Sequence, residues 1–167
     1  MDPLPLSRLP RGSRVFLDAN VLIYAAGASS KECDELLAKC SQQQITGVCL
    51  YETLNEATHR LMLLEARAKG LIRTGQVKEL REHPRAVRQL NDFWRETERL
   101  LKQNLLFLPL TEQLVRLAQR ERQLFSLLTN DSMIVACMRR YGIPFLASSD
   151  RDFERVDGIT IYRPGDL

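Results

Sequence analysis

The chain of 167 residues is poor in the residues that build several common kinds of site. It has only two histidines, His59 and His83, which are too few for a histidine-rich metal site. None of its four cysteines belongs to a C-x-x-C pair, and their spacing matches no zinc motif. We therefore expect reduced thiols of a cytoplasmic protein, and no metal site built from sulfur or imidazole.

Long apolar runs are absent as well. No stretch approaches the roughly 18 consecutive apolar residues that a membrane span needs, so we expect no membrane contact. The opening residues 1–5 lack the charged and then apolar pattern of a secretory signal. The sequence also lacks the G-x-x-x-x-G-K-[ST] phosphate loop and the G-x-G-x-x-G, G-x-S-x-G and H-E-x-x-H motifs. These absences disfavour phosphate-loop, dinucleotide, serine-hydrolase and zinc-protease chemistry.

The sequence does contain short apolar segments that alternate with longer helical patterns. Its 44% hydrophobic and 27% charged residues are ordinary for a soluble protein, and we predict a single domain over residues 1–167. Strands separated by helices imply parallel pairing with helices on both faces of the sheet. We therefore predict an α/β fold, a three-layer α/β/α sandwich around a central, mostly parallel sheet of four to five strands. The predicted strands cover residues 14–18, 44–48, 105–108, 143–147 and 159–162.

Helical periodicity marks the segments between these strands. Residues 1–13 are expected to be irregular, and residues 66–102 to form an inserted helical arm that includes a helix started by Pro84. Ser29 or Ser30 is expected to cap one helix, and Thr129 or Asn130 another. Two apolar helix faces are predicted, one with Leu50, Leu54, Ala57, Leu61 and Leu64, the other with Leu114, Leu117, Ala118, Leu124 and Phe125.

The positive charge is concentrated in the predicted arm. Residues 60–102 hold eleven Lys and Arg against six Asp and Glu, a local charge of +5 in a chain of +3. Such a segment suits the binding of phosphates. A solvated helix with ion pairs between residues four apart explains the same pattern, and charge alone favours that explanation.

Four acidic residues stand at strand ends or helix starts. Asp18 and Asp150 directly follow apolar strands, Glu52 lies in the first turn after another strand, and Asp131 begins a helix. The carboxyl ends of parallel strands share one edge, so Asp18, Glu52 and Asp150 should meet there, whereas the pattern does not place Asp131. Each acid alone is explained by helix capping or the helix dipole. Together they destabilise the fold unless protons or a cation neutralise them.

A cluster of carboxylates suits hard cations, Mg²⁺ or Mn²⁺. A metal held in this way can activate water and stabilise the displacement at a phosphodiester. The residues therefore predict metal-dependent phosphodiester hydrolysis. Phosphatase chemistry of the haloacid-dehalogenase type is disfavoured, because it needs Asp-x-Asp where this chain has Asp18-Ala19-Asn20.

Three segments resemble motifs of the PIN-domain ribonucleases. VFLDANVLIYAA is similar to the family's opening strand, LYETLNEATHRL to its second motif, and NDSMIVACMRRYGIPFLASSDRDF to its C-terminal block. The resemblance spans about residues 14–163 and keeps the order of the motifs. It implies an α/β/α sandwich and cleavage of RNA with Mg²⁺ or Mn²⁺.

The resemblance also implies roles for individual residues. Asn20 is implied to orient the first acid or a metal-bound water, Ser148 to bind phosphate or a carboxylate, and Asp152 to act as an outer or water-mediated ligand. Glu56 lies one helical turn beyond Glu52 and is an alternative ligand, although the Tyr-Glu-x-x-Asn run makes Glu52 the better match. The residues that match the catalytic and metal-binding quartet are Asp18, Glu52, Asp131 and Asp150.

Many small proteins of this family are toxins of toxin–antitoxin pairs. The resemblance therefore implies a cytoplasmic toxin with an RNA substrate, an antitoxin partner and a homodimeric state. A housekeeping RNA-processing nuclease fits the same residues. A non-catalytic RNA- or protein-binding module on the same fold is the alternative from another functional class.

Overall fold

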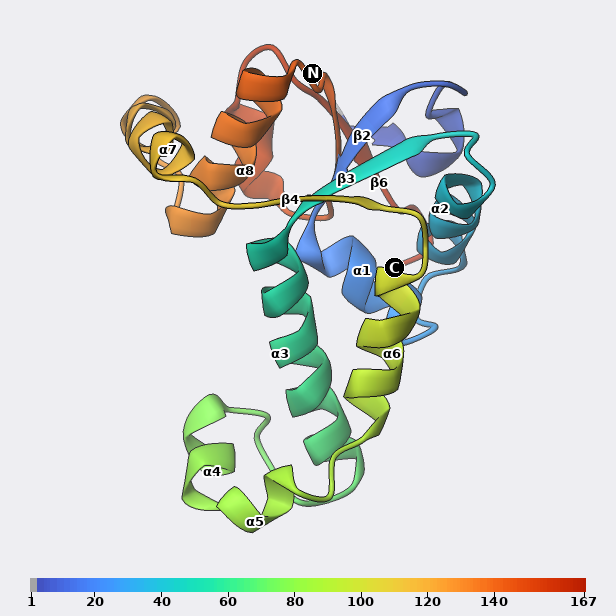
Figure 1. Cartoon of the computed structure of the whole chain (residues 1–167), viewed down its shortest axis with the longest axis vertical. Helices are drawn as coiled ribbons and strands as arrows, with labels where there is room; N and C mark the ends of the chain where they lie inside the picture. The colour runs from blue at the N-terminus through green and yellow to red at the C-terminus, as the bar shows by residue number, and fades with distance from the viewer. Residues whose placement is uncertain (1–2) are drawn as a thin grey trace.

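In a computed structural model that describes residues 3–167, six parallel strands form one sheet in the order β1-β6-β5-β2-β3-β4 (Figure 1). This confirms the predicted α/β class and the parallel pairing, with more strands than the four to five expected. The strands are β1 (Leu4–Pro5), β2 (Arg14–Leu17), β3 (Thr46–Leu50), β4 (Leu106–Leu108), β5 (Phe145–Ala147) and β6 (Thr160–Arg163).

The additional strand lies in the segment that we expected to be irregular. β1 pairs with β6, with Leu4 opposite Tyr162, and a 3-10 turn, η1 (Leu6–Arg8), follows it. The prediction for residues 1–13 is therefore wrong at residues 4–8, while residues 1–2 lie outside the described part. A two-residue edge strand is too short for periodicity, and an edge position tolerates Pro5.

Helices cover both faces of the sheet. Alternation along β2 directs Val15 and Leu17 to one apolar core and Phe16 to the other. The first core includes residues of α1, α2, α3 and α6, and the second includes residues of α7 and α8. The helices are α1 (Ala19–Ala26), α2 (Lys31–Ser41), α3 (Tyr51–Ala68), α4 (Val77–Glu82), α5 (Pro84–Val87), α6 (Asp92–Leu101), α7 (Glu112–Phe125) and α8 (Thr129–Tyr141). A second 3-10 turn is η2 (Arg151–Arg155).

Two predictions about helix ends have different outcomes. Ser30 caps α2, because its hydroxyl accepts a hydrogen bond from the backbone N–H of Cys33. Thr129 and Asn130 were wrong as caps of α8. Both residues lie inside the helix, which begins at Thr129 after an N-cap at Leu128 that makes no side-chain hydrogen bond.

The predicted apolar faces are only partly buried. Leu54 and Leu61 of α3 and Leu114 of α7 lie in the cores. Leu64, Leu117 and Leu124 are exposed instead, so the two predicted faces are too wide. A helix that packs on one side buries a narrow stripe, and these three residues lie at its margins.

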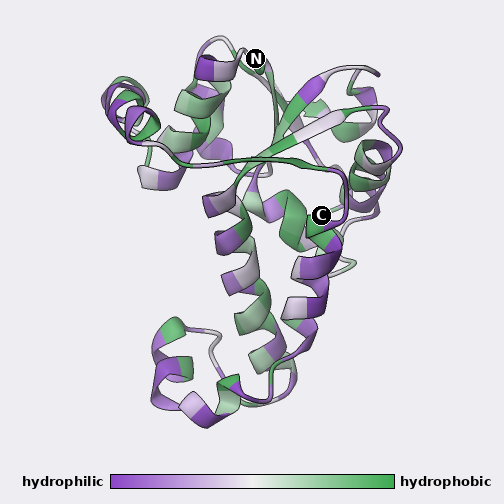
Figure 2. Ribbon diagram, viewed as in Figure 1, coloured by the Kyte–Doolittle hydropathy of each residue, from purple (hydrophilic) through white to green (hydrophobic). Residues whose placement is uncertain are grey.

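Residues 66–102, which we call the arm, lie in a helical projection. The second half of α3 and α6 run side by side away from the sheet, and α4 and α5 lie at their far end (Figure 1). A separate small apolar core fills the arm and includes Leu63, Ile72, Leu80 and Leu90. Figure 2 shows both hydrophobic and hydrophilic positions along each helix of the arm. Among the described residues, no helix has both the length and the apolar character that crossing a membrane requires.

The sheet topology brings the predicted acidic ends together. β2 lies between β3 and β5 and is parallel to both. Leu17 pairs with Ala147, so Asp18 and Ser148 follow at the same level of neighbouring strands. The start of α3 lies at the same carboxyl edge, because α3 follows β3 directly.

Candidate functional site

Asp18 is a buried acid at the start of α1. Its Oδ1 accepts a hydrogen bond of 2.7 Å from the backbone N–H of Ala19, and its Oδ2 accepts one of 2.7 Å from the Ser148 hydroxyl. The residue is only 9% exposed. Burial raises the pKa of Asp18 to about 6, against the lowering effect of these two hydrogen bonds, and the nearby charges of Glu56 and Asp131 raise it further. With this pKa, the Asp18 carboxylate can bind either a proton or a cation at a pH slightly below neutral.

Asn20 and Ser148 connect the ends of β2 and β5. The Asn20 amide donates to Asp18 Oδ2 at 2.5 Å and to the Ser148 hydroxyl at 3.1 Å, while its carbonyl oxygen accepts from the Ser149 backbone N–H at 3.1 Å. The Ser148 hydroxyl also accepts from the backbone N–H of Asp150 at 3.0 Å. The orientation of Asp18 and the backbone position of Asp150 are thus set by one hydrogen-bonded network.

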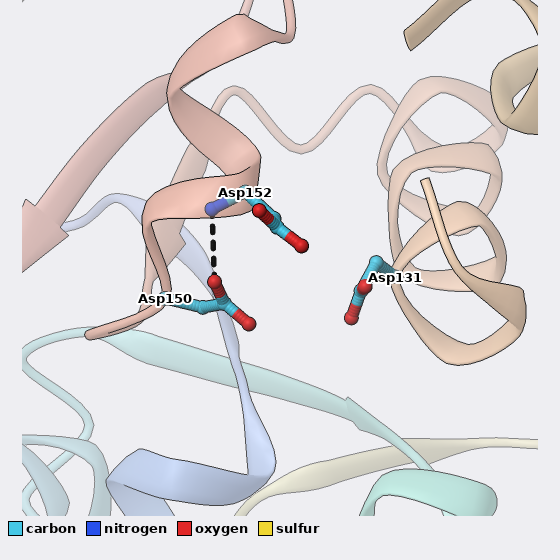
Figure 3. A group of neighbouring side chains, drawn as sticks. All are labelled: Asp131, Asp150 and Asp152. Atoms are coloured by element: carbon cyan, nitrogen blue, oxygen red, sulfur yellow. Dashed lines mark hydrogen bonds between the residues drawn. The ribbon is translucent and has the colours of Figure 1, made fainter. Parts of the chain in front are cut away.

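Three further acids form a compact cluster beside this network. Asp131, Asp150 and Asp152 each offer a carboxylate oxygen, and these oxygens all lie within 4.8 Å of one another (Figure 3). Asp131 comes from the first turn of α8, so helix packing supplies the acid that the sequence pattern left unplaced. Burial raises the pKa of Asp131, and the charges of Asp150, Asp152 and Glu56 raise it further.

Asp152 is more central than predicted, because it lies inside the cluster. Its backbone N–H donates to Asp150 Oδ1 at 2.8 Å, which caps η2. Its own carboxylate pairs with Arg155 at 2.7 Å. Asp131 and Asp150 have no ion-pair partner among residues 3–167, so their charges are the ones left to be neutralised.

The structure places both candidate glutamates on α3 but in different surroundings. Oε2 of Glu52 is buried and receives no hydrogen bond from the described residues. Glu56 is more exposed and accepts a hydrogen bond of 2.8 Å from the side-chain amide of Asn130. Its charge nevertheless acts on Asp18 and Asp131. Glu52 therefore has an acceptor oxygen in need of a partner, whereas Glu56 contributes negative charge.

These residues fit a hard divalent cation. The available donors are carboxylate oxygens, which Mg²⁺ and Mn²⁺ prefer, and the cluster contains no cysteine or histidine. The unpartnered Glu52 oxygen is costly when buried, and a cation would satisfy it. The pKa of Asp131 is raised first by burial and then by the negative charges of Asp150, Asp152 and Glu56, and a cation would offset the part due to those charges.

Several residues around the acids were missed by the sequence analysis. Arg163 donates to the backbone carbonyl of Asp150 at 3.3 Å, and the Tyr24 hydroxyl lies 3.4 Å from the Ser149 hydroxyl. These contacts join segments far apart in the chain, and no local pattern signals them. Arg155 was detectable in principle, since it follows Asp152 at the three-residue spacing of a helical ion pair.

The family model of the PIN domain matches residues 15–159. The chain belongs to the PIN domain family. This confirms the resemblance drawn from the three motifs. Among curated proteins, it is similar to Ribonuclease VapC6 of Methanocaldococcus jannaschii, with 28% identity over 156 residues that cover 90% of this chain and 97% of that protein.

Solved structures share the fold at lower sequence identity. VapBC2 from Rickettsia felis, solved bound to a DNA fragment from its promoter, matches with a TM-score of 0.59 and 13% identity, covering 90% of this chain and 98% of the other. VapC20 of Mycobacterium tuberculosis, described as a toxin that cleaves the sarcin-ricin loop, matches with a TM-score of 0.57 and 16% identity, covering 89% and 98%. These likenesses establish the fold of the chain.

Proposed function

We propose that this PIN domain is an endoribonuclease that hydrolyses RNA phosphodiester bonds with the aid of Mg²⁺ or Mn²⁺. The observation that carries the proposal is the cluster of Asp131, Asp150 and Asp152 beside the buried Asp18, at the carboxyl edge of a parallel sheet. The relatives named ribonucleases support the same activity.

Four carboxylates are proposed to hold the cation: Asp18, Glu52, Asp131 and Asp150. Asp152 is proposed to assist from the same cluster, because its pairing with Arg155 makes it the weaker ligand. Bound there, the ion would lower the pKa of a water molecule and neutralise the charge that develops on the phosphate. We prefer Glu52 to Glu56 because its buried Oε2 receives no hydrogen bond from residues 3–167.

The remaining residues of the site orient these carboxylates. Asn20 and Ser148 donate to the same oxygen of Asp18, so this side chain cannot rotate without losing both bonds. Glu56, which lies outside the proposed ligand set, accepts a single hydrogen bond from Asn130 of α8. A fixed arrangement reduces the reorganisation that the reaction would otherwise require.

The biological role that we infer is that of a toxin in a type II toxin–antitoxin pair. The named relatives and the solved toxin–antitoxin complexes with this fold support it. Under this proposal the partners are an RNA substrate and an antitoxin protein, and the homodimer and the cytoplasmic location stay predictions from the resemblance.

The test compares cleavage of a labelled RNA by the wild type, Asp18→Asn and a matched control, Asp157→Asn. Asp157 is exposed, and in the hydrogen bond that it makes only its backbone carbonyl takes part, so its side-chain charge is expendable. We expect cleavage by the wild type and the control in Mg²⁺ or Mn²⁺, none in EDTA, and a loss of at least about a hundredfold in Asp18→Asn. Equal rates for wild type and Asp18→Asn would refute the proposed mechanism.

A further inference from the structure

A groove leads away from the acidic site between α1 and α3. It has a volume of about 390 Å³ and starts at Asn20, whose amide is bonded to Asp18. Its far end is formed by Thr74 and Gly75, in the loop between α3 and α4. We call it the α1/α3 groove; its other lining residues are Ile23, Tyr24, Arg60, Leu63, Leu64 and Arg67.

Two arginines of the groove carry uncompensated charge. Arg60 and Arg67 are exposed, lie two turns apart on one face of α3, and form no ion pair with any acid in residues 3–167. At about 1.5 Å per residue their backbones are about 10 Å apart along the helix axis. Five other cations of the arm are paired with acids, namely Lys69, Arg73, Lys78, Arg95 and Arg99. The cations of the arm that also lack an ion pair within residues 3–167 do not line the groove; they are Arg81, Arg85, Arg88 and Lys102. The two free guanidinium groups are therefore available to an anionic ligand.

Between these arginines and the polar ends of the groove, the lining is mainly apolar and includes an aromatic ring. Tyr24 and Leu63 line it, together with Leu64, which is 50% exposed. The Tyr24 hydroxyl lies 3.4 Å from that of Ser149, which places the ring directly beside the segment that carries Asp150. A ligand in the groove would therefore meet cationic groups, a stacking surface and, at one end, the acidic site.

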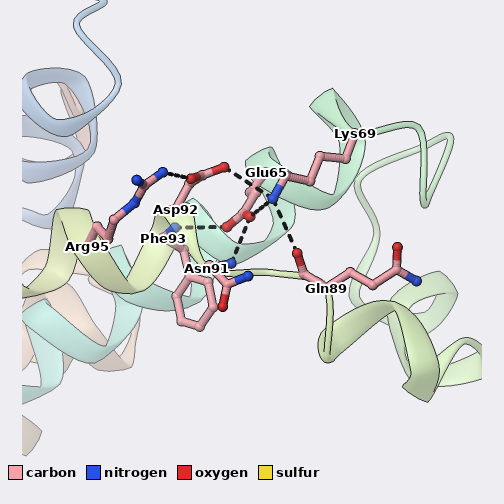
Figure 4. Close-up of polar contacts among 7 residues, drawn as sticks. All are labelled: Glu65, Lys69, Gln89, Asn91, Asp92, Phe93 and Arg95. Carbon is pink, nitrogen blue, oxygen red and sulfur yellow. Dashed lines mark hydrogen bonds and ion pairs between the residues drawn. The ribbon is translucent and has the colours of Figure 1, made fainter.

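The arm holds the far wall of the groove in place. Glu79 accepts hydrogen bonds from the backbone N–H groups of Arg73 and Thr74 at 2.8 and 2.9 Å, and these bonds lower its pKa to about 2. Glu65 accepts from the backbone of Asn91 and Phe93 and from Lys69, which ties the start of α6 to α3 (Figure 4). Glu79 thus ties Arg73 and Thr74, at the far end of the groove, to α4.

We propose that the α1/α3 groove binds single-stranded RNA and leads it to the acidic site, with Arg60 and Arg67 contacting phosphates and Tyr24 stacking on a base. This inference rests on the proposed function, since it names the form of the substrate. Charge complementarity favours a polyanion, and continuity with the acidic site favours the nucleic acid that would be cleaved there. An aromatic and apolar lining suits a single strand, because base faces are accessible only when they are not stacked within a duplex.

The experiment measures equilibrium binding of a fluorescein-labelled oligouridylate of about 12 nucleotides, within the site sizes usual for single strands. EDTA prevents cleavage, and the salt concentration is varied. The test variant is Arg60→Gln/Arg67→Gln. The matched control is Arg85→Gln/Arg88→Gln, which removes the same charge from two exposed arginines of the arm that do not line the groove.

We expect the test variant to bind about tenfold more weakly and to lower the slope of log affinity against log salt by about 1.4, the value for two lost contacts to a single strand. The control should retain the wild-type slope. Tyr24→Leu should weaken binding about tenfold through lost stacking, whereas Tyr24→Phe should retain it. Circular dichroism of each variant checks that it is folded.

Two outcomes would overturn the inference: wild-type affinity and slope in Arg60→Gln/Arg67→Gln, or tighter binding of a duplex of the same length than of the single strand. In the first case the groove serves another ligand, such as an acidic peptide. Failure of the proposed function is distinguishable, because wild-type protein would then bind the oligonucleotide through the groove yet leave it intact in Mn²⁺. Conversely, if the wild type cleaves RNA but Arg60→Gln/Arg67→Gln binds the oligonucleotide as tightly as the wild type, only the proposed RNA-binding role of the groove is refuted.

Discussion

Replacing Asp18 by Asn should change how the stability of the metal-free protein depends on pH. The pKa of Asp18 is about 6 in the folded protein, against an ordinary value of 3.8, chiefly because of burial. An acid with a raised pKa binds its proton more tightly in the folded state, so its contribution is greatest below the unfolded pKa. Stability then falls as pH rises between the two values and stays low above about pH 6. A difference of about two pH units corresponds to about 3 kcal/mol.

The assay is urea unfolding in EDTA for both proteins at several values between about pH 4 and pH 7.5. The informative quantity is the wild-type free energy of unfolding minus that of Asp18→Asn. Asn at position 18 cannot accept all the bonds that Asp18 accepts from Asn20, Ser148 and Ala19, but that loss is the same at every pH. Because the series starts just above the unfolded pKa, we expect the difference to fall by about 2.4 of these 3 kcal/mol between pH 4 and pH 7.5. Parallel profiles for the two proteins would refute the assignment of a raised pKa to Asp18.

The remaining predictions concern a residue bonded to Asp18, an ion pair of the arm and a glycine of the central sheet. Ser148→Ala removes a hydrogen bond that lowers the pKa of Asp18, so that pKa should rise further. The pH-dependent fall in the stability of the variant should then extend to higher pH than in the wild type, as the same unfolding series would show. Glu65→Gln should cost about 2 kcal/mol in urea unfolding and increase amide hydrogen exchange in α6, because the carboxylate accepts two backbone bonds and an ammonium bond. Gly47→Ala should cost about 1–3 kcal/mol in thermal or urea unfolding, because its new methyl group would lie 2.7 Å from a side-chain carbon of Leu105.

Sequence patterns predict the position of an acidic residue in the site where that residue directly follows an apolar strand. The runs before Asp18 and Asp150 identify two strands, and parallel pairing then requires their ends to share an edge. Asp131 illustrates the limit, because it follows a helix, and only the packing of α8 on the sheet determines where it lies. The inclusion of Asp152 depends on η2, a short turn with no periodic signal.

The same limit applies to the helix surfaces. Periodicity identified helical segments, but it could not show which margin of each apolar stripe meets a partner. Leu64 and Leu124 were therefore predicted to be buried and are exposed. Likewise, net charge in the arm could not separate paired from unpaired cations. The four-residue spacing of Glu65 and Lys69 is compatible with their ion pair, but only the three-dimensional contacts show that Arg67, between them in sequence, pairs with no acid in residues 3–167.

The most direct test of the central claim is a calorimetric titration of the protein with Mn²⁺ in the absence of RNA, comparing the wild type with Asp150→Asn and the Asp157→Asn control. If the acidic cluster holds a divalent cation, the wild type and the control will bind Mn²⁺ at one site class, and Asp150→Asn will bind it at least about tenfold more weakly. Undetectable binding by the wild type, or equal affinity in Asp150→Asn, would contradict the assignment of these carboxylates as a metal site.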